Sequence, residues 1–209
     1  MKEALWVRLR RKSPRNLARI VWQMAWLRIF SLLYSVWLRF LGAEVGRGCL
    51  FRGPLEIRGD PARIRIGSHC VFEPWVCLWT HDYGEGHGRI ELHDSVLLGR
   101  RVTVNSYDRI TLGEGCALGD GCYVQDNDHG TMPDVPILAQ PSHGAAITFG
   151  PDVWLGARCI VLKGVTIGAH TVAGAGSIVV KSLPENVVAV GVPCRPVKLR
   201  GGEELKRAA

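Results

Sequence analysis

The sequence has no two cysteines in a CxxC arrangement, and its cysteine count is odd, at seven in 209 residues. Disulfide frameworks and structural zinc sites need cysteines in pairs or clusters. We therefore predict neither of them. Unpaired cysteines at this frequency favour a reducing compartment.

The sequence also lacks an uncharged apolar run long enough to cross a bilayer. The most apolar stretch, residues 20–41, is interrupted by Arg28 and Arg39, which leave ten uncharged residues between them. A membrane-spanning helix needs about 20 such residues. A small-residue cleavage site does not follow the stretch either. We expect neither a transmembrane helix nor a cleaved signal peptide.

Net positive charge is confined to the first 42 residues. The formal net charge is +7, and residues 1–42 carry nine Lys or Arg against one Glu, so residues 43–209 sum to −1. A nucleic-acid-binding domain carries a basic surface, and we do not expect such a partner. The change in charge divides the chain into a basic arm, residues 1–42, and a main domain with a C-terminal tail, residues 43–209.

The arm has no Gly before position 42 and contains four of the seven Trp residues, namely Trp6, Trp22, Trp26 and Trp37. This composition predicts two helices with a break near Ser13 and Pro14. Two interpretations of the arm remain open. The Trp residues and the basic cluster Arg8–Arg19 could place it in the interface of an anionic membrane. Alternatively, it could cap the exposed edge of the main domain or pack against a neighbouring subunit.

The main domain repeats with a period of six residues. An apolar residue leads each repeat, and a small or apolar residue follows four positions later. This period is typical of a parallel β-helix, an all-β solenoid, here of about six coils. Five cysteines fall at the inward small position, so we expect them to be buried. The leading residues are Val45, Phe51, Ile57, Ile66, Phe72, Leu78, Leu92, Leu98, Val104, Leu112, Leu118, Val124, Phe149, Leu155, Val161, Ile167, Ala173 and Val179, and the cysteines are Cys49, Cys70, Cys116, Cys122 and Cys159.

Two polar segments interrupt the repeat, Trp79–Glu91 and Gln125–Ile147. A long excursion from a compact body is more often functional than decorative. The second excursion contains His129, which follows Asp126 and Asp128. Neighbouring carboxylates can orient an imidazole and hold its pKa near working pH, so His129 is the candidate acid–base group.

The segments DNDHG (126–130) and AITFGPDVWLGARCIVLKGVTIGAHTVAGAGSIVVKSLPENVVAVGVPCRPVK (146–198) resemble the hexapeptide-repeat O-acetyltransferases. That family includes galactoside, maltose and polysaccharide O-acetyltransferases. The resemblance is dense from Asp126 to Lys198, looser from Val45 onward and absent in the arm. It implies a left-handed parallel β-helix, a homotrimer with active sites between subunits, acetyl-CoA as the donor and a His as the base.

The resemblance also implies roles for individual residues. His129 matches the catalytic His, and Trp154 matches an aromatic residue near donor and acceptor. The backbone N–H of Ala157, beside Gly156, matches the contact to the thioester. For the rest of the donor, the resemblance implies contacts from Gly174 and Ala175 to pantetheine and from Lys181 and Arg195 to the 3′-phosphate of CoA. For the acceptor, it implies contacts from Asn105, Asp108 and Asp126.

We therefore predict a cytoplasmic acetyl-CoA-dependent O-acetyltransferase that acts on a sugar hydroxyl in the biosynthesis of lipopolysaccharide, capsule or exopolysaccharide. The arm suggests a place on the inner face of the cytoplasmic membrane and a glycan acceptor that is lipid-linked. Three alternatives stay open: acetylation of a small molecule such as an antibiotic or serine, a non-catalytic scaffold, and a zinc hydratase. A related β-helix zinc site needs two His separated by four residues, a spacing that the sequence lacks, so no metal is expected.

Overall fold

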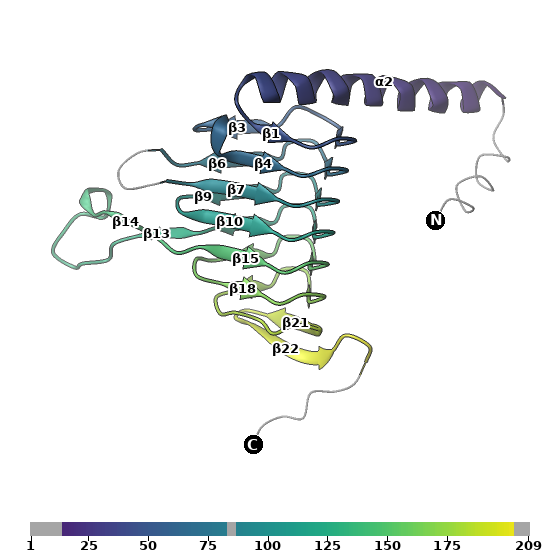
Figure 1. The fold of residues 1–209 in the computed structure, drawn as a ribbon. Coiled ribbons are helices and arrows are strands. Elements are labelled where there is room, and N and C mark those ends of the chain that lie inside the picture. The colour runs from purple at the N-terminus through teal and green to yellow at the C-terminus, as the bar shows by residue number, and fades with distance from the viewer. Residues whose placement is uncertain (1–13, 83–86, 203–209) are drawn as a thin grey trace.

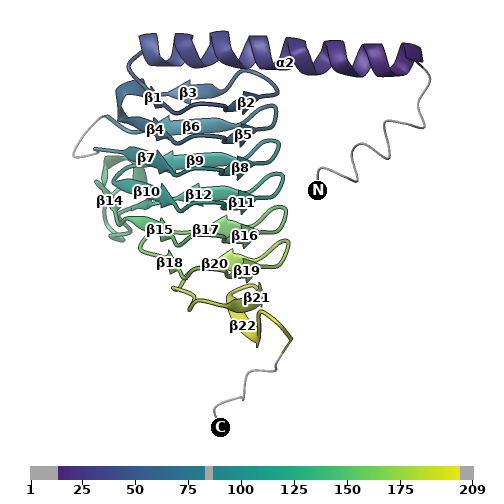
Figure 2. The same cartoon turned by 45° about the vertical axis from the view of Figure 1, so that its right-hand side comes forward.

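The computed structural model describes residues 14–82 and 87–202. In these residues the chain winds as a parallel β-helix of six coils, and each coil contributes one strand to each of three sheets (Figure 1). Two further strands and an N-terminal helix close the two ends of the stack (Figure 2). The predicted six-coil solenoid is confirmed.

Each sheet collects one strand from every coil, in parallel register. Sheet 1 consists of β1 (Glu44–Val45), β4 (Ile64–Ile66), β7 (Arg89–Leu92), β10 (Arg109–Leu112), β15 (Ile147–Phe149) and β18 (Thr166–Ile167). Sheet 2 consists of β2 (Leu50–Phe51), β5 (Val71–Phe72), β8 (Leu97–Leu98), β11 (Ala117–Leu118), β16 (Trp154–Leu155), β19 (Val172–Ala173), β21 (Val187–Gly191) and β22 (Cys194–Leu199). Sheet 3 consists of β3 (Glu56–Arg58), β6 (Cys77–Thr80), β9 (Thr103–Ser106), β12 (Tyr123–Gln125), β17 (Ile160–Val161) and β20 (Ile178–Val179). A short 3-10 turn, η1 (Pro61–Arg63), links the first two coils.

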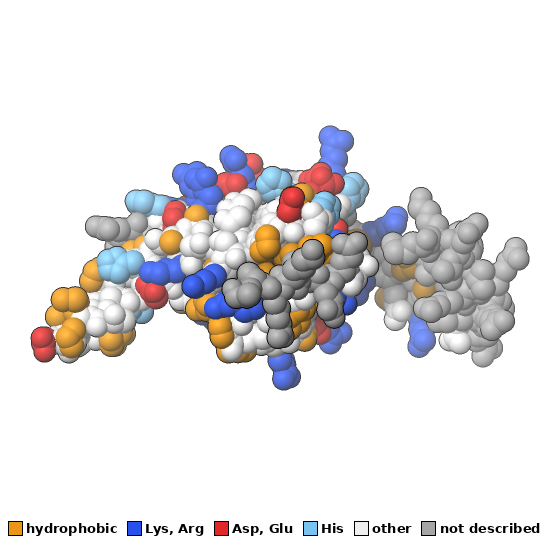
Figure 3. All heavy atoms as spheres, turned by 90° about the horizontal axis from the view of Figure 1, so that it is seen from below, with side chains coloured by type: hydrophobic (Ala, Val, Ile, Leu, Met, Phe, Trp, Pro, Cys, Tyr) orange, Lys and Arg blue, Asp and Glu red, His pale blue; other side chains and the backbone are white. Residues whose placement is uncertain are grey.

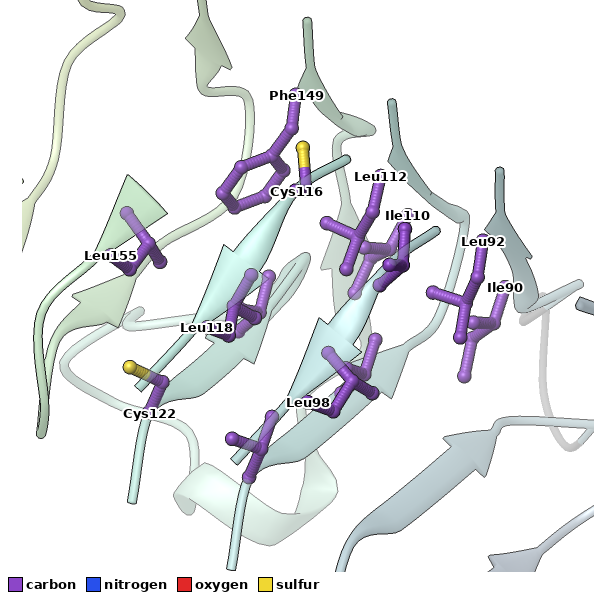
Figure 4. Close-up of a cluster of buried hydrophobic side chains, with 14 of the residues drawn as sticks. Ile90, Leu92, Leu98, Ile110, Leu112, Cys116, Leu118, Cys122, Phe149 and Leu155 are labelled. Atoms are coloured by element: carbon purple, nitrogen blue, oxygen red, sulfur yellow. The ribbon is translucent and has the colours of Figure 1, made fainter. Parts of the chain in front are cut away.

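The repeat-leading residues fill the axis of the stack, where side chains of successive coils lie on one another (Figure 4). All of them are buried except Ile57, which is half-buried in the first coil. The five predicted inward cysteines are buried as free thiols, together with Cys77 and Cys194. Because each coil buries its apolar side chains only against its neighbours, the two end coils need covers.

At the C-terminal end, β21 pairs with β19 and then turns into the antiparallel strand β22. This hairpin covers the last coil and ends the parallel stack. The last strand of sheet 2 therefore runs in the direction opposite to the strands of the coils.

At the other end, one helix, α2 (Pro14–Phe40), lies across the first coil (Figures 1 and 2). Ser31 Oγ accepts a hydrogen bond from the Phe51 N–H at 2.9 Å, and Tyr34 Oη accepts one from the Leu55 N–H at 2.9 Å. Arg39 donates to the carbonyl of Val45. The helix therefore caps backbone groups that the first coil cannot pair with another coil. The predicted break near Ser13 and Pro14 falls at the limit of the described residues, and the first of the two predicted helices lies outside them.

The N-terminal half of α2 extends beyond the body, as both views show. Its exposed apolar side chains include Trp22 and Trp26, whose rings stack with centroids 6.1 Å apart. By length and composition, Ala18–Phe40 could cross a membrane, and only 11% of the apolar window is buried. This differs from the sequence prediction, because Arg28 and Arg39 do not prevent one continuous apolar helix.

Candidate active site

The second excursion leaves the body where sheet 3 turns into sheet 1, between the fourth and fifth coils. It begins with β13 (Asn127–His129) and returns through β14 (Ser142–Gly144), and these strands form an antiparallel pair in which His129 lies opposite Ser142. The segment between them includes the turn η2 (Ile137–Ala139). Figure 3 shows this segment projecting from the body with apolar side chains toward its end.

Asp126 anchors the base of this hairpin. Its carboxylate is fully buried and accepts hydrogen bonds from Ser106 Oγ at 3.0 Å, from the Tyr107 N–H at 2.6 Å and from the Asp108 N–H at 3.0 Å. Burial raises the pKa of this carboxyl, and the three donors partly offset that effect. Asp126 thus joins the corner of the third coil to the exit of the fourth.

His129 is exposed on the hairpin, and its Nδ1 lies 3.4 Å from Ser142 Oγ on the opposite strand. The sequence predicted that Asp126 and Asp128 orient this ring, and that is wrong. Asp126 holds backbone groups of the third coil, while Asp128 pairs with Lys163 Nζ at 2.5 Å. These contacts position the strand that carries His129, and within the described residues Ser142 is the hydrogen-bond partner of the ring.

A small polar pocket of about 290 Å³ lies at the strand β14 that pairs with the His129 strand, and His129 itself is not among its lining residues. Asp108, Tyr107 and Ser142 line it, together with His87 from the first excursion and His143. Close packing shapes its wall, because a Cβ on Gly144 would lie 2.9 Å from Tyr107 Cδ1. Of the predicted acceptor residues, Asp108 is therefore at the pocket, where a hydroxylated ligand would find several polar partners.

Asn105, another predicted acceptor residue, is buried at the adjacent face of sheet 3. Its Oδ1 lies 2.7 Å from His81 Nε2, and its Nδ2 donates to Tyr123 Oη at 3.2 Å. His81 in turn stacks on Trp79, with centroids 4.6 Å apart. Asn105 is thus one member of a polar and aromatic row that supports the corner below the pocket.

The predicted donor-binding residues lie on other parts of the coils. Trp154 points outward from β16 with 56% of its surface exposed. Ala157 and Ala175 occupy equivalent turns between sheets 2 and 3 in adjacent coils, and a Cβ on Gly156 would lie 2.5 Å from the Ala175 nitrogen. Within the described residues, neither the Ala157 N–H nor the Ala175 N–H donates to another group. These turns present two stacked donors that a carbonyl-rich chain could bind.

Lys181 and Arg195 are both exposed. Lys181 follows β20 at the corner between sheets 3 and 1, whereas Arg195 lies in β22 opposite Val190. Gly174 lies in the same turn as Ala175. A single chain therefore places His129 and the Ala157 and Ala175 turns at different corners of the three-sided coil.

The sequence did not identify Ser142, Lys163 or the two pocket histidines as parts of the site. Ser142 and His143 lie sixteen to seventeen residues after Asp126 in a segment without repeat periodicity. The antiparallel pairing of β13 and β14 brings them together, and a strand pair of three residues leaves little periodic signal in sequence. Among the described residues, no group of three or more His, Cys, Asp or Glu is placed to hold a metal ion.

Comparison with known proteins adds an independent line of evidence. No family model matches the chain. A Mycobacterium tuberculosis protein named as an acetyltransferase, Rv3034c, is 34% identical over 213 residues, which cover 93% of this chain and 68% of that protein. WbbJ of Escherichia coli, named as an O-acetyl transferase of lipopolysaccharide biosynthesis, is 32% identical and is matched over 80% of its length.

Solved structures show the same architecture. AntD, an N-acyltransferase from Bacillus cereus determined with coenzyme A, superposes with a TM-score of 0.67 at 21% identity, over 78% of this chain and 87% of that chain. A galactoside acetyltransferase in complex with coenzyme A superposes with a TM-score of 0.52 at 25% identity, over 78% of this chain and 68% of that chain. These likenesses confirm the predicted left-handed parallel β-helix.

The coils have the left-handed β-helix fold of these solved structures, and the sequence similarity to named acetyltransferases shows that this protein is an acyltransferase of that class. With relatives of this identity and coverage, the chain belongs to the hexapeptide-repeat acetyltransferase family. The predicted resemblance is confirmed, and so is the prediction that the protein is an enzyme.

Proposed function

We propose that this protein transfers acetyl from acetyl-CoA to a sugar hydroxyl, with His129 as the general base. The position of His129 carries the proposal. The ring is exposed, it is held on a braced hairpin, and its hydrogen-bond partner Ser142 lines a polar pocket large enough for part of a sugar. The names of WbbJ and of WcaF, an Escherichia coli relative named for colanic acid biosynthesis and 33% identical, support a polysaccharide pathway.

In this reaction the acceptor oxygen attacks the thioester carbonyl while His129 takes the hydroxyl proton. The Ala157 N–H would stabilise the charge that develops on the carbonyl oxygen. Collapse of the intermediate breaks the C–S bond, and the proton from His129 passes to the departing thiolate. The products are the acetyl ester and CoA, without an acyl-enzyme.

The proposal includes a homotrimer with the site between neighbouring subunits. Its support is the separation of His129 from the Ala157 and Ala175 turns within one chain. The end of the excursion presents exposed apolar side chains away from its own body, namely Met132, Val135, Ile137 and Leu138. Such a protruding apolar surface is typical of a segment that packs on another subunit.

Donor binding tests the transferase class directly. In a calorimetric titration we expect about one acetyl-CoA to bind per chain. Dephospho-CoA is expected to bind about tenfold more weakly or worse, because each charge-assisted hydrogen bond contributes about 1.5–3 kcal/mol. Replacing both Lys181 and Arg195 with Gln should remove the difference between the two ligands, while Arg101→Gln should preserve it. If the folded protein binds neither ligand, the result would favour the non-catalytic scaffold over the transferase.

The acceptor is proposed to be a lipid-linked glycan of the biosynthetic pathway at the inner face of the cytoplasmic membrane. Full turnover with a free antibiotic or serine would favour the small-molecule alternative. The exposed helix residues support a peripheral membrane contact through residues 1–42, because stacked Trp side chains favour the bilayer interface.

Point variants test this contact better than deletion of the arm, which would also remove the cap on the first coil. We expect Trp22→Gln with Trp26→Gln to weaken vesicle binding more than tenfold, since each indole can bury about 150 Å² or more of apolar surface. Trp75→Gln is the matched control, because Trp75 is 71% exposed on the body of the protein. Equal flotation of both variants with the wild type would contradict the membrane contact.

A further inference from the structure

An open groove of about 840 Å³ lies between α2 and the first coil. Its polar wall contains Arg28 and Arg39 from the helix, Arg47 from the first turn of the coil, and His69 from the turn below. Leu32 and Leu50 provide its apolar wall. No carboxylate lines the groove within the described part of the chain.

Hydrogen bonds fix the Arg39 side chain and the backbone of the turn that carries Arg47. Arg39 is fixed by the Val45 carbonyl at 2.7 Å and by the Gly46 carbonyl at 3.1 Å. The turn that carries Arg47 stacks on the next one, because the Arg47 N–H donates to Ser68 Oγ at 3.3 Å and the Arg47 carbonyl accepts from the His69 N–H at 2.8 Å. The backbone of the groove floor is therefore braced at Arg39 and Arg47.

Close packing also sets the position of His69. Gly48 has a φ of +71°, and a Cβ there would lie 2.6 Å from His69 Nδ1. Glycine at this position both permits the turn and leaves space for the imidazole. Arg28 and Arg47 are exposed, and neither forms an ion pair with a carboxylate among the described residues. Their charges are thus not neutralised by the body of the protein.

The combination of cations with an apolar wall selects an amphiphilic anion. Residues 1–13 are not complementary to the groove, since they carry five Lys or Arg against one Glu. The groove lies under the same helix whose exposed Trp side chains support the membrane contact proposed above, on which this inference rests. Arg is well suited to phosphate oxygens, because its planar fork can donate two hydrogen bonds.

We propose that this groove binds the phosphate head group of an acidic membrane phospholipid. Arg28 and Arg47 contact the phosphate, and the proximal part of an acyl chain lies along Leu32 and Leu50. The site orients the first coil toward the bilayer and thereby sets the height of His129 above the membrane surface. Arg39 shapes the groove but remains engaged with the backbone.

The test uses flotation with vesicles of phosphatidylcholine, alone or mixed with phosphatidylglycerol. A variant with Arg28→Gln and Arg47→Gln is compared with Arg19→Gln, which removes a charge from the same helix outside the groove. One charge near an anionic surface changes binding about fivefold, so the double variant is expected to lose about 25-fold or more on the mixed vesicles. Arg19→Gln should lose about fivefold or less.

A second measurement separates the groove from the membrane contact. Dihexanoyl phosphatidylglycerol, below its micelle concentration, is titrated into the full-length protein. Saturable binding of one lipid per chain that the double variant lacks supports the groove, even if the wild type binds no vesicle and the membrane contact fails. Absence of saturable binding, or, where the wild type does bind vesicles, a double variant that floats like Arg19→Gln, would overturn the proposal. Full displacement of the lipid by glycerol 3-phosphate at similar concentration would assign the site to soluble phosphates and overturn the lipid as its occupant.

Discussion

Replacing His129 with alanine is expected to lower kcat on the order of a hundredfold or more, because general-base catalysis contributes at least that much. The dissociation constant of acetyl-CoA should change little, since the ring is not proposed to hold the donor in the ground state. Steady-state kinetics with a hydroxylated acceptor, combined with donor titration, measures both quantities.

The matched control is His93→Ala, which removes another exposed His from a turn of the third coil. Its kcat should equal that of the wild type. Ser142→Ala should have a smaller effect than His129→Ala, because Ser142 acts on the ring only through a long contact of 3.4 Å. If His129→Ala turns over at the wild-type rate, the general-base assignment fails and the scaffold alternative gains support.

The His129→Ala variant also tests whether the site lies between subunits. Ala175→Leu should block the donor turn with a bulky exposed side chain while leaving His129 intact. When the two inactive variants are unfolded together and refolded into mixed assemblies, activity should return if one chain supplies His129 and its neighbour supplies the donor turn. Mixtures that stay inactive, although light scattering shows that they are trimers, would place the whole site in one chain.

Asp126→Asn is expected to lower the free energy of unfolding by about 3 kcal/mol, because it turns an amide N–H₂ toward donors that now face a carboxylate oxygen. The Tyr107 N–H, the Asp108 N–H and Ser106 Oγ all donate to Asp126 in a fully buried site. Urea unfolding followed by circular dichroism measures the loss. Activity should fall with it, since these bonds position the hairpin that carries His129.

Asp128→Asn is the control for this prediction. Asp128 is exposed and pairs with Lys163 at the surface, where an ion pair contributes about 1 kcal/mol or less. Its unfolding midpoint should therefore stay near that of the wild type. Equal losses in the two variants would show that the buried hydrogen bonds of Asp126 do not anchor the corner.

The pH dependence of stability follows from the same residue. Burial is the largest cause that raises the pKa of the Asp126 carboxyl above its ordinary value of 3.8. A carboxyl with a raised pKa in the folded state binds its proton more tightly there than in the unfolded state. Its contribution to the free energy of unfolding is therefore full below pH 3.8 and declines as pH rises through the folded-state pKa. The difference in free energy of unfolding between the wild type and Asp126→Asn should therefore become smaller as pH rises from 3.8 through the folded-state pKa. Urea unfolding at a series of pH values measures it.

The arm shows why part of this molecule could not be predicted from sequence. Its composition left a membrane contact and a cap both open, because Trp, Ser and Arg side chains suit either one. The structure shows that Ser31, Tyr34 and Arg39 bind backbone groups of the first coil. The opposite part of the helix stays exposed, so capping leaves surface for another contact. Only the position of the first coil distinguishes these two surfaces.

The candidate site, like the arm, could be predicted only in part from the sequence. His129 could be selected from sequence, because it stands where a six-residue repeat stops and because its surroundings resemble those of a catalytic His. Its partners could not be, since Ser142 faces it across an antiparallel pair and Lys163 comes from a later coil. The predicted partners Asp126 and Asp128 are adjacent in the chain, but their carboxylates point to other elements.

The sequence by itself determined the β-helix, its number of coils and the register of its buried cysteines. The physical reason is that a six-residue period repeats the same packing pattern in every coil. The inward-facing positions of each repeat can therefore be identified from that repeat alone. The tertiary structure alone decided which side chains surround His129, which face of α2 covers the first coil, and where a cationic groove forms beside it. Those features depend on contacts between segments far apart in the chain, and no local pattern records which segments meet.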